Sequence, residues 1–420
     1  MVTARVADRE VDVLLVGAGP ASDACATELR ERGFEGSILL VGRELDPPYD
    51  RPPCSKELLR GETSREGIRL HPEEHWEQRG IELLTRTSVT KLDPAARSVQ
   101  LSSKQEVVYG QALLATGAMV RRLNVEGSEL EGIHYLRAPA NAEAIHKDAA
   151  EAQRVVLVGG SYIGCEVAAS MTMLGKRCTI LMQEGHPLER GFGLRVGAWA
   201  RGVLEAHEVE IVAEDELDFY RGDEDGHVEA VVCGSGRALE ADLVVIGAGA
   251  VPDVMVARAA GLSLGASGGI ECDSRLRTSA DSVWAAGDVC EYDSAVHGRR
   301  LRVEHWEVAL AQGRYVAASM LGKAESYSEI PYFWSDIGDW TTLEYVGPAQ
   351  TWDRVVVRGS IEDGEAFSVW YVDQDRLVAA LAVGRSEDLD HARRLMRSRV
   401  SVVEHETALC DVASDLSAVG

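Results

Sequence analysis

The sequence predicts an α/β protein in which parallel sheets are covered by helices, with a smaller α+β domain at the C-terminus. Apolar runs alternate with segments of helical pattern over most of the chain, which indicates parallel sheets. After about residue 326 the composition shifts towards aromatic residues, and the alternating runs 354–358 and 367–372 are typical of antiparallel strands. A final helix is expected to carry the arginines of residues 393–399.

Two glycine-rich turns each follow an apolar run. Residues 13–22 read VLLVGAGPAS, and residues 155–164 read VVLVGGSYIG. Where a buried strand turns tightly into a helix, free backbone N–H groups and the positive end of the helix dipole attract a pyrophosphate. Serine replaces one glycine of each fingerprint, at Ser22 and Ser161, but it is small enough for close packing. Two such turns predict two Rossmann-like dinucleotide-binding domains, with FAD and NAD(P)H as the natural pair of ligands.

An acidic residue ends the apolar run that follows each turn. Glu44 follows residues 38–41 and Glu184 follows residues 179–182, each about 20 residues beyond its turn. A carboxylate at this place accepts hydrogen bonds from a ribose. No arginine follows Glu184 before Arg190, so a 2′-phosphate would have no evident cation. This pattern favours NADH over NADPH.

The order of the motifs predicts that the first domain is discontinuous, with the second inserted into it. The first unit ends near Gly117, a buried run at 243–246 leads into another glycine turn, and a third motif, VWAAGD, occupies residues 283–288. The expected segments are the FAD-binding domain at 1–117 and 248–325, the NAD(H)-binding domain at 118–247 and the C-terminal domain at 326–420.

The composition disfavours some classes of partner. The 420 residues are 45% hydrophobic, and the formal net charge of −25 disfavours nucleic acid and anionic membranes as partners. No run approaches the roughly 18 apolar residues of a transmembrane helix. The N-terminus lacks the apolar core of a signal peptide, so we expect a cytoplasmic protein. Either a monomer or a homodimer is compatible with the sequence.

The chain has eight cysteines, and no two of them form a C-x-x-C or another close pair. This spacing argues against a zinc site, an iron–sulfur cluster and a dithiol redox centre. We therefore expect reduced, buried thiols and no bound metal.

Six motifs in this order resemble the FAD-dependent pyridine-nucleotide reductases that feed ferredoxins and rubredoxins, a family that shares its fold with apoptosis-inducing factor and monodehydroascorbate reductase. They are PYDRPPCSK at 48–56, ATG at 115–117, GGSYIGCE at 159–166, AGD at 286–288, RVEHW at 302–306 and PYFWSD at 331–336. They span most of the chain. Two positions depart from the family pattern, because Cys54 stands where an apolar residue is usual and Arg43 where an acid is common.

The resemblance implies a role for each matching position. The residues implied to bind FAD are Gly17, Gly19, Pro20, Ala21, Glu44, Arg51, Lys56, Thr116, Gly117, Asp288, Glu304, His305, Trp306 and Trp334. Those implied to bind NADH are Gly159, Gly160, Tyr162, Ile163, Gly164, Glu184 and Gly249. Lys56 and Glu166 are the candidate catalytic pair, which in the family meets near the flavin N5 atom.

The resemblance also implies a function. A flavin accepts two electrons as hydride and releases them singly, so the chain would pass electrons from NADH through FAD to a ferredoxin or a similar small iron–sulfur protein. The alternatives are an NADH-dependent reductase or oxidase of a small acceptor, and a redox-controlled binding protein of the apoptosis-inducing-factor type. The arginines at 299, 300, 302, 393, 394, 397 and 399 could dock an acidic ferredoxin or could be solvated faces.

Overall fold

The computed structural model describes residues 8–362, 364 and 366–419, and these residues fold into two compact units. The first unit contains the described part of Met1–Asp50, together with Arg69–Met119 and Val251–Phe333. The second contains Arg51–Ile68, Val120–Ala250 and the described part of Trp334–Gly420. The chain passes from one unit to the other within β7 (Ala118–Val120) and β16 (Ala250–Pro252), among other places. The predicted α/β class is confirmed, whereas the predicted domain boundaries stay a prediction.

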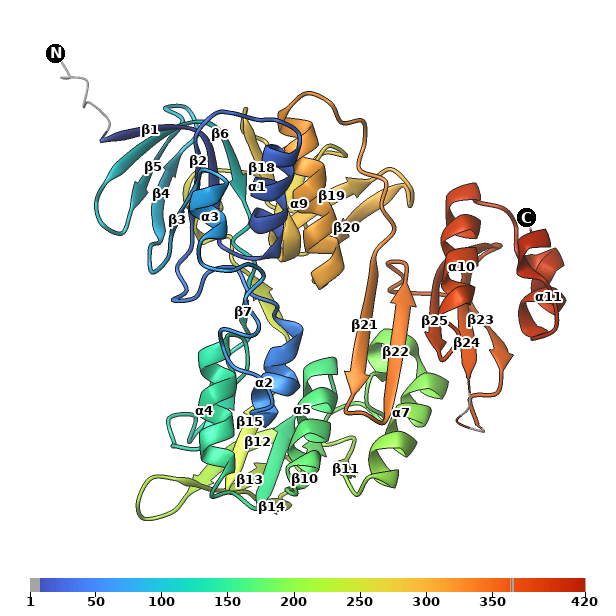
Figure 1. The fold of residues 1–420 in the computed structure, drawn as a ribbon. Helices are drawn as coiled ribbons and strands as arrows, with labels where there is room; N and C mark the ends of the chain where they lie inside the picture. Colours follow the sequence, from blue (N-terminus) through green and yellow to red (C-terminus); the bar gives the residue numbers. More distant parts are fainter. Residues whose placement is uncertain (1–7, 363, 365, 420) are drawn as a thin grey trace. The chain divides into compact units, whose positions relative to one another are not determined.

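The first unit is built on a seven-stranded sheet whose central strands are parallel (Figure 1). The parallel strands are β3 (Ile81–Leu84), β2 (Ile38–Val41), β1 (Arg9–Val16), β6 (Glu106–Leu114) and β18 (Val283–Ala285). The sheet continues with β5 (Ser98–Leu101), which is antiparallel to β6, and β4 (Val89–Asp93), which is antiparallel to β5. Every residue of β2 is buried, as expected of a strand covered on both faces.

Two long helices of the first unit pack tightly together. They are α1 (Pro20–Glu31) and α9 (Trp306–Met320), which lie side by side in Figure 1. A Cβ atom on Gly313 of α9 would lie 2.1 Å from the carbonyl oxygen of Ala21, so glycine permits this approach. The other elements of the unit are α3 (His75–Gln78), α8 (Met255–Ala259), η2 (Gly287–Val289) and a small sheet of β17 (Ile270–Cys272), β19 (Cys290–Ser294) and β20 (Arg299–Arg302).

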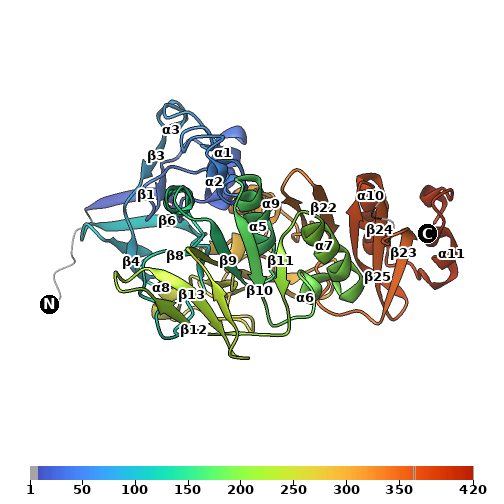
Figure 2. The same cartoon turned by 90° about the horizontal axis from the view of Figure 1, so that it is seen from below.

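The second unit repeats the parallel arrangement. Its five-stranded sheet has the order β11 (Glu210–Val212), β10 (Arg177–Leu181), β9 (Arg154–Val158), β15 (Leu243–Ile246) and β8 (Ile133–Tyr135). Helix α5 (Tyr162–Met173) runs alongside β10 in both views (Figures 1 and 2). The remaining elements of this part are η1 (Pro52–Ser55), α2 (Glu57–Arg60), α4 (Pro139–Ala149), α6 (Glu189–Phe192), α7 (Leu194–Ala206), β12 (Leu217–Gly222), β13 (Val228–Cys233) and β14 (Ala238–Glu240).

The C-terminal part of the second unit carries the predicted antiparallel strands. The order is β21 (Tyr332–Ile337), β22 (Thr341–Val346), β25 (Arg376–Val383), β24 (Phe367–Asp373) and β23 (Arg354–Gly359). Helix α10 (Ser386–Ser398) packs on β25. Two details of the predicted final helix are wrong: Arg399 follows the helix in a left-handed conformation, and α11 (Glu406–Cys410) comes after α10, with η3 (Val403–His405) before it and η4 (Leu416–Ala418) after it.

Among the described residues, no helix has the length and apolar content that crossing a membrane requires.

Candidate functional site

The first glycine turn lies at the carboxyl edge of the sheet in the first unit. The register aligns Val16 with Val41 on one side and with Leu114 on the other, and Leu114 also pairs with Ala285. Parallel pairing therefore brings the four segments that follow these strands to one edge, although they are far apart in sequence. This is the edge at which open α/β sheets bind ligands.

Gly17 is required by the backbone at this turn. Its φ is +104°, and a Cβ atom would lie 2.1 Å from the carbonyl oxygen of Ala115 and 3.1 Å from the N atom of Thr116. The structure thus brings the predicted residues Gly17 and Thr116 together. Gly19 is the N-cap of α1 and gives it no side-chain hydrogen bond, and Pro20 at the start of the helix has no N–H to leave unpaired. The start of α1 therefore offers its backbone N–H groups and dipole to an anion.

The acid of the first unit is held by a neutral donor. The Glu44 carboxylate accepts a hydrogen bond of 2.7 Å from the Tyr49 hydroxyl. The neighbouring Arg43 forms an ion pair of 2.6 Å with Asp253, and the Thr116 hydroxyl donates to the Asp253 carbonyl oxygen at 2.6 Å. Asp253 was not predicted as part of the site, because no motif surrounds it.

The third motif ends in η2, where Asp288 lies after the buried Gly287. The N–H group of Gly287 donates to the buried Gln312 side chain at 2.7 Å, which anchors the motif to α9. Arg302 donates to the Asp288 carbonyl oxygen at 3.2 Å and also pairs with Glu304. Gln312 holds the motif in place, and sequence reasoning did not identify it.

His305 and Trp306 form the start of α9. The His305 ring stacks on Phe333, with ring centroids 4.1 Å apart, and burial lowers the pKa of His305 to about 4. The imidazole is therefore neutral at neutral pH. A neutral, stacked imidazole suits a structural or hydrogen-bonding role.

The second glycine turn repeats the geometry of the first with a different cap. Gly159 has φ +111°, and a Cβ atom there would lie 2.7 Å from the Gly247 carbonyl oxygen. A Cβ atom on Gly164 would lie 2.1 Å from the Gly159 carbonyl oxygen. Ser161 caps α5: its hydroxyl accepts a hydrogen bond from the Gly164 N–H and donates to the Gly247 carbonyl oxygen at 2.9 Å. Serine in place of the middle glycine thus supplies a cap.

The other residues predicted for NADH surround this turn. A Cβ atom on Gly160 would lie 2.5 Å from the Met182 sulfur, so the turn packs closely on the next strand end. Ile163 is partly exposed, and the Tyr162 ring meets Phe192 edge-on. Gly249, with φ +92°, lies beyond the end of β15.

Glu184 has a cationic partner. Arg190 lies in the short helix α6 and approaches the Glu184 carboxylate to 2.6 Å. The prediction that no cation would lie near this acid is therefore wrong, because α6 folds back towards the end of β10. The argument from spacing no longer separates NADH from NADPH.

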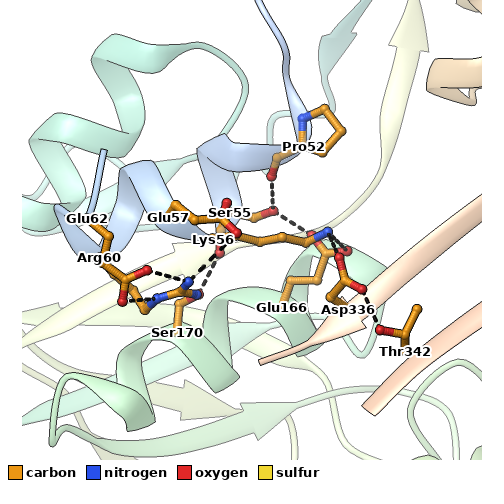
Figure 3. A network of polar contacts seen from close by, with 10 residues as sticks. All are labelled: Pro52, Ser55, Lys56, Glu57, Arg60, Glu62, Glu166, Ser170, Asp336 and Thr342. Atoms are coloured by element: carbon orange, nitrogen blue, oxygen red, sulfur yellow. Dashed lines mark hydrogen bonds and ion pairs between the residues drawn. The ribbon is translucent and has the colours of Figure 1, made fainter. Parts of the chain in front are cut away.

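A buried polar network surrounds Lys56 in the second unit (Figure 3). Lys56 and Glu166 are each only 7% exposed, and their charged atoms are 3.8 Å apart. The predicted pair is thus brought together, but the nearer partner of the Lys56 ammonium is Asp336, at 2.7 Å. Asp336 is the last residue of the PYFWSD motif, which was identified in the sequence, but no role was predicted for this residue.

Hydroxyl groups hold both carboxyl groups of this network. Glu166 accepts hydrogen bonds from Ser55 at 2.5 Å and from Ser335 at 2.6 Å. Asp336 accepts one of 2.6 Å from Thr342. Each carboxyl group therefore keeps its own set of donors while it lies near the shared ammonium group.

The two carboxyl groups differ in acidity. Burial raises the pKa of Glu166, and the Lys56 ammonium and two serine hydroxyls only partly oppose this effect. Burial also acts on Asp336, but hydrogen bonds from Lys56, Thr342 and Trp334 outweigh it and lower the pKa of that carboxyl group. Asp336 is therefore the ionised partner of Lys56, while Glu166 holds a proton over a wider range of pH.

Arg51 and Trp334, both predicted to bind FAD, also lie in the second unit. The Arg51 guanidinium donates to the Arg137 carbonyl oxygen. Trp334 is half-buried on β21 and hydrogen-bonds to Asp336. Residues predicted for FAD thus occur in both units, and all those predicted for NADH occur in the second.

Several of the arginines considered for docking make contacts within the chain. Arg394 donates to the carbonyl oxygens of Leu416 at 2.8 Å and Val419 at 2.7 Å, which fastens the C-terminal segment to α10. Arg393 pairs with Asp390, and Arg300 with Glu271 and Asp293. These contacts favour a structural role for Arg394 and Arg300.

Two family models match the chain. The model described as pyridine nucleotide-disulphide oxidoreductase matches residues 11–313, and a reductase C-terminal model matches residues 332–419. The rubredoxin-NAD(+) reductase of Pseudomonas putida is 34% identical over 367 residues, which are 87% of this chain and 94% of the relative.

Solved structures agree in fold over nearly the whole chain. The ferredoxin reductase for the CYP199A2 system from Rhodopseudomonas palustris has a TM-score of 0.92 and 30% identity, covering 97% of this chain and 98% of that one. The covalent putidaredoxin reductase–putidaredoxin complex has a TM-score of 0.91 and 32% identity, covering 98% of each chain.

Proposed function

The chain belongs to the pyridine nucleotide-disulphide oxidoreductase family, and on this premise we propose that it passes electrons from NADH through FAD to a small iron–sulfur protein of the ferredoxin class. The observation that carries this proposal is that the same arrangement occurs twice. Each unit places a glycine turn, a helix start and an acid at the carboxyl ends of parallel strands. Two dinucleotide sites in one chain are what hydride exchange between two dinucleotides requires.

The residues of the first unit fit the ADP half of FAD. The uncapped start of α1 suits a pyrophosphate, Gly17 keeps the backbone free of a side chain, and Glu44 offers a carboxylate to a ribose. Asp288 would bind the ribityl chain, and the segment from Glu304 to Trp306 would contact the flavin. Bound FAD accepts a hydride and releases electrons one at a time, which the side chains of the protein cannot do.

The second turn fits NADH. Gly159 and Gly164 allow close approach of a pyrophosphate, and Glu184 lies at the end of the next strand, where it would meet the ribose. The name of the Pseudomonas putida relative specifies NAD(+), and this similarity supports NADH over NADPH.

Lys56 and Glu166 are the proposed catalytic residues. The Lys56 ammonium is nearly excluded from water, so its charge acts strongly on negative charge that develops on a reduced flavin. Asp336 orients the ammonium group of Lys56, and Glu166 is close enough to replace Asp336 as the partner of that group. We propose that Lys56 changes partner between these carboxyl groups when the nicotinamide arrives. The protein is proposed to act in the cytoplasm.

Rapid mixing of the FAD-loaded protein with NADH tests this proposal. We expect Lys56→Met to slow flavin reduction by about 100- to 1,000-fold, the size of effect seen when one preorganised electrostatic group is lost. Lys91→Met, which changes an exposed lysine of β4 in the first unit, is the control and should reduce at the wild-type rate.

Turnover with a ferredoxin completes the test. The proposal is wrong if the protein fails to take up FAD or if its reduced form passes no electrons to any small iron–sulfur protein. A Lys56→Met variant that is reduced as fast as the wild type would remove Lys56 from catalysis but would leave the overall reaction intact.

A further inference from the structure

A histidine–aspartate cluster in the first unit consists of residues that have no role assigned above. It consists of Asp23 in the first turn of α1, His71, and His75 at the start of α3. The His75 N–H bonds to the Pro72 carbonyl oxygen at 3.1 Å, and this turn brings the two imidazoles face to face with centroids 3.6 Å apart. The Asp23 carboxylate lies 2.8 Å from the His71 Nε2 atom.

The three side chains form a donor set that suits a divalent transition metal. One ligand atom from each, a carboxylate oxygen and two imidazole nitrogens, lie within 4.8 Å of one another. Two histidines and one carboxylate are a known zinc set that leaves the fourth position to water.

His75 supplies a second observation that points to a ligand. Its Nε2 atom is buried and has no hydrogen-bond partner in the described part of the chain. A buried polar atom without a partner costs about 1–3 kcal/mol, so an internal fold alone gives no reason to place it there. The hydrogen bond with Asp23 accounts for a His71 nitrogen but leaves this nitrogen of His75 unexplained.

A buried tryptophan borders the cluster. The buried Trp76 ring meets both imidazoles edge-on, with ring centroids 5.5 Å from that of His71 and 5.0 Å from that of His75.

We propose that Asp23, His71 and His75 bind one zinc-class divalent cation that ties α1 to α3. Neighbouring ligands of a tetrahedral zinc ion are about 3.4 Å apart, given Zn–N bonds of about 2.0–2.1 Å. The parallel imidazoles cannot both direct a nitrogen lone pair at one ion, so binding turns one ring out of the stack and replaces the Asp23–His71 contact. The cysteine spacing gave no sign of this site, because no thiol takes part.

Titration of the metal-stripped, FAD-loaded protein with Zn²⁺ tests this proposal. Calorimetry should show one equivalent bound per chain, and Co²⁺ should give the visible absorption of a tetrahedral site. His75→Gln should weaken Zn²⁺ binding more than about 100-fold, beyond the 10–100-fold typical of a residue outside the ligand shell. Zn²⁺ should raise the unfolding temperature of the wild type but not that of His75→Gln.

The control is His227→Ala, which removes the exposed imidazole of another histidine–acid pair, 3.3 Å from Glu131. This variant should bind Zn²⁺ like the wild type. The proposal is overturned if the wild type binds no Zn²⁺, or if His75→Gln binds it with unchanged affinity. If His75→Gln fails to fold, Asp23→Asn, which keeps the side-chain size, must show the same loss of Zn²⁺ binding.

Discussion

The two glycine turns share a topology but differ in how the helix start is satisfied. At the first turn, Gly19 gives α1 no side-chain cap, so its N–H groups depend on water or a ligand. At the second, the Ser161 hydroxyl accepts from the Gly164 N–H and ties the turn to the Gly247 carbonyl oxygen. The difference suits a site that keeps its dinucleotide and a site that must empty in each turnover, because a self-capped helix start loses less when its ligand leaves.

The two units also differ in the partner of the acid and in the kind of titratable group that each buries. Glu44 is held by the neutral Tyr49 hydroxyl, whereas Glu184 pairs with the highly exposed Arg190. The first unit buries a histidine that burial keeps neutral, and the second buries a carboxyl group that burial makes harder to ionise. Four measurements test this comparison.

Alanine at the first glycine of each turn should separate the two sites most strongly. In Gly17→Ala, the Cβ atom meets the Ala115 carbonyl oxygen at 2.1 Å in a left-handed backbone, so we expect more than about 2 kcal/mol of destabilisation and loss of FAD. In Gly159→Ala, the corresponding contact is 2.7 Å, and the protein should stay yellow but be reduced slowly by NADH.

Flavin absorbance per chain and thermal unfolding report these effects. Gly19→Ala is the control for folding, since a Cβ atom there has no neighbour within 4 Å. Full FAD content in Gly17→Ala would show that the first turn does not hold the dinucleotide.

The buried groups should give the two units opposite responses to pH. Because the pKa of His305 is lowered from 6.5 to about 4, the unfolded chain takes up a proton there before the folded chain does. Its stabilising contribution is present above pH 6.5 and is lost as the pH falls towards 4, a change of about 3 kcal/mol. Glu166 has a raised pKa, so its contribution is present at low pH and is lost as the pH rises.

Chemical unfolding at a series of pH values measures both contributions. His305→Gln should flatten the acid side of the stability profile, and Glu166→Gln should flatten the side above the ordinary pKa of a glutamate. An acid-side slope that persists in His305→Gln would mean that another group takes up the proton.

Removal of the cap should have a smaller effect, confined to the second turn. Ser161→Ala leaves the Gly164 N–H without its side-chain acceptor and should cost about 1 kcal/mol of stability. Removal of the cap should destabilise the empty site more than the occupied one, so NADH should bind more tightly to Ser161→Ala than to the wild type. Urea unfolding with and without NADH measures both quantities, and an equal loss in the two conditions would contradict the proposed role of the cap.

The smallest effect is expected at the Glu184–Arg190 pair. Arg190 is 81% exposed, so the pair contributes at most about 1 kcal/mol to stability. Arg190→Ala should leave unfolding nearly unchanged, but it should lower the rate of reduction by NADPH relative to NADH by removing the cation nearest the ribose acid. An unchanged ratio of the two rates would show that Arg190 does not contact the nucleotide.

The parts predicted best from the sequence are those set by local chemistry. The turns at Gly17 and Gly159 were identified because tight strand-to-helix turns need glycine. The acids Glu44 and Glu184 were identified because they follow the apolar runs of the next strands. The antiparallel strands β23 and β24 were evident from alternation of period two. Lys56 and Glu166 came from the family resemblance, and the structure places their charged atoms 3.8 Å apart.

The pairings across long sequence distances were decided by the tertiary structure alone. Asp336 meets Lys56 across 280 positions, and parallel pairing places Cys272 and Cys290, separated in sequence, on the neighbouring strands β17 and β19. Asp23 and His71 likewise meet only because α1 and the segment before α3 fold together.

By itself, the sequence determined the two dinucleotide turns, their acids and the class of the fold, because turn geometry and hydrophobic period depend on neighbouring residues. The tertiary structure decided which charged side chains form pairs, since strand register and the path of each connection determine which distant side chains meet. Arg190 shows the difference clearly. It lies six positions beyond Glu184, too far along the sequence to be predicted as its partner, but the short helix α6 folds back and places it 2.6 Å from that acid.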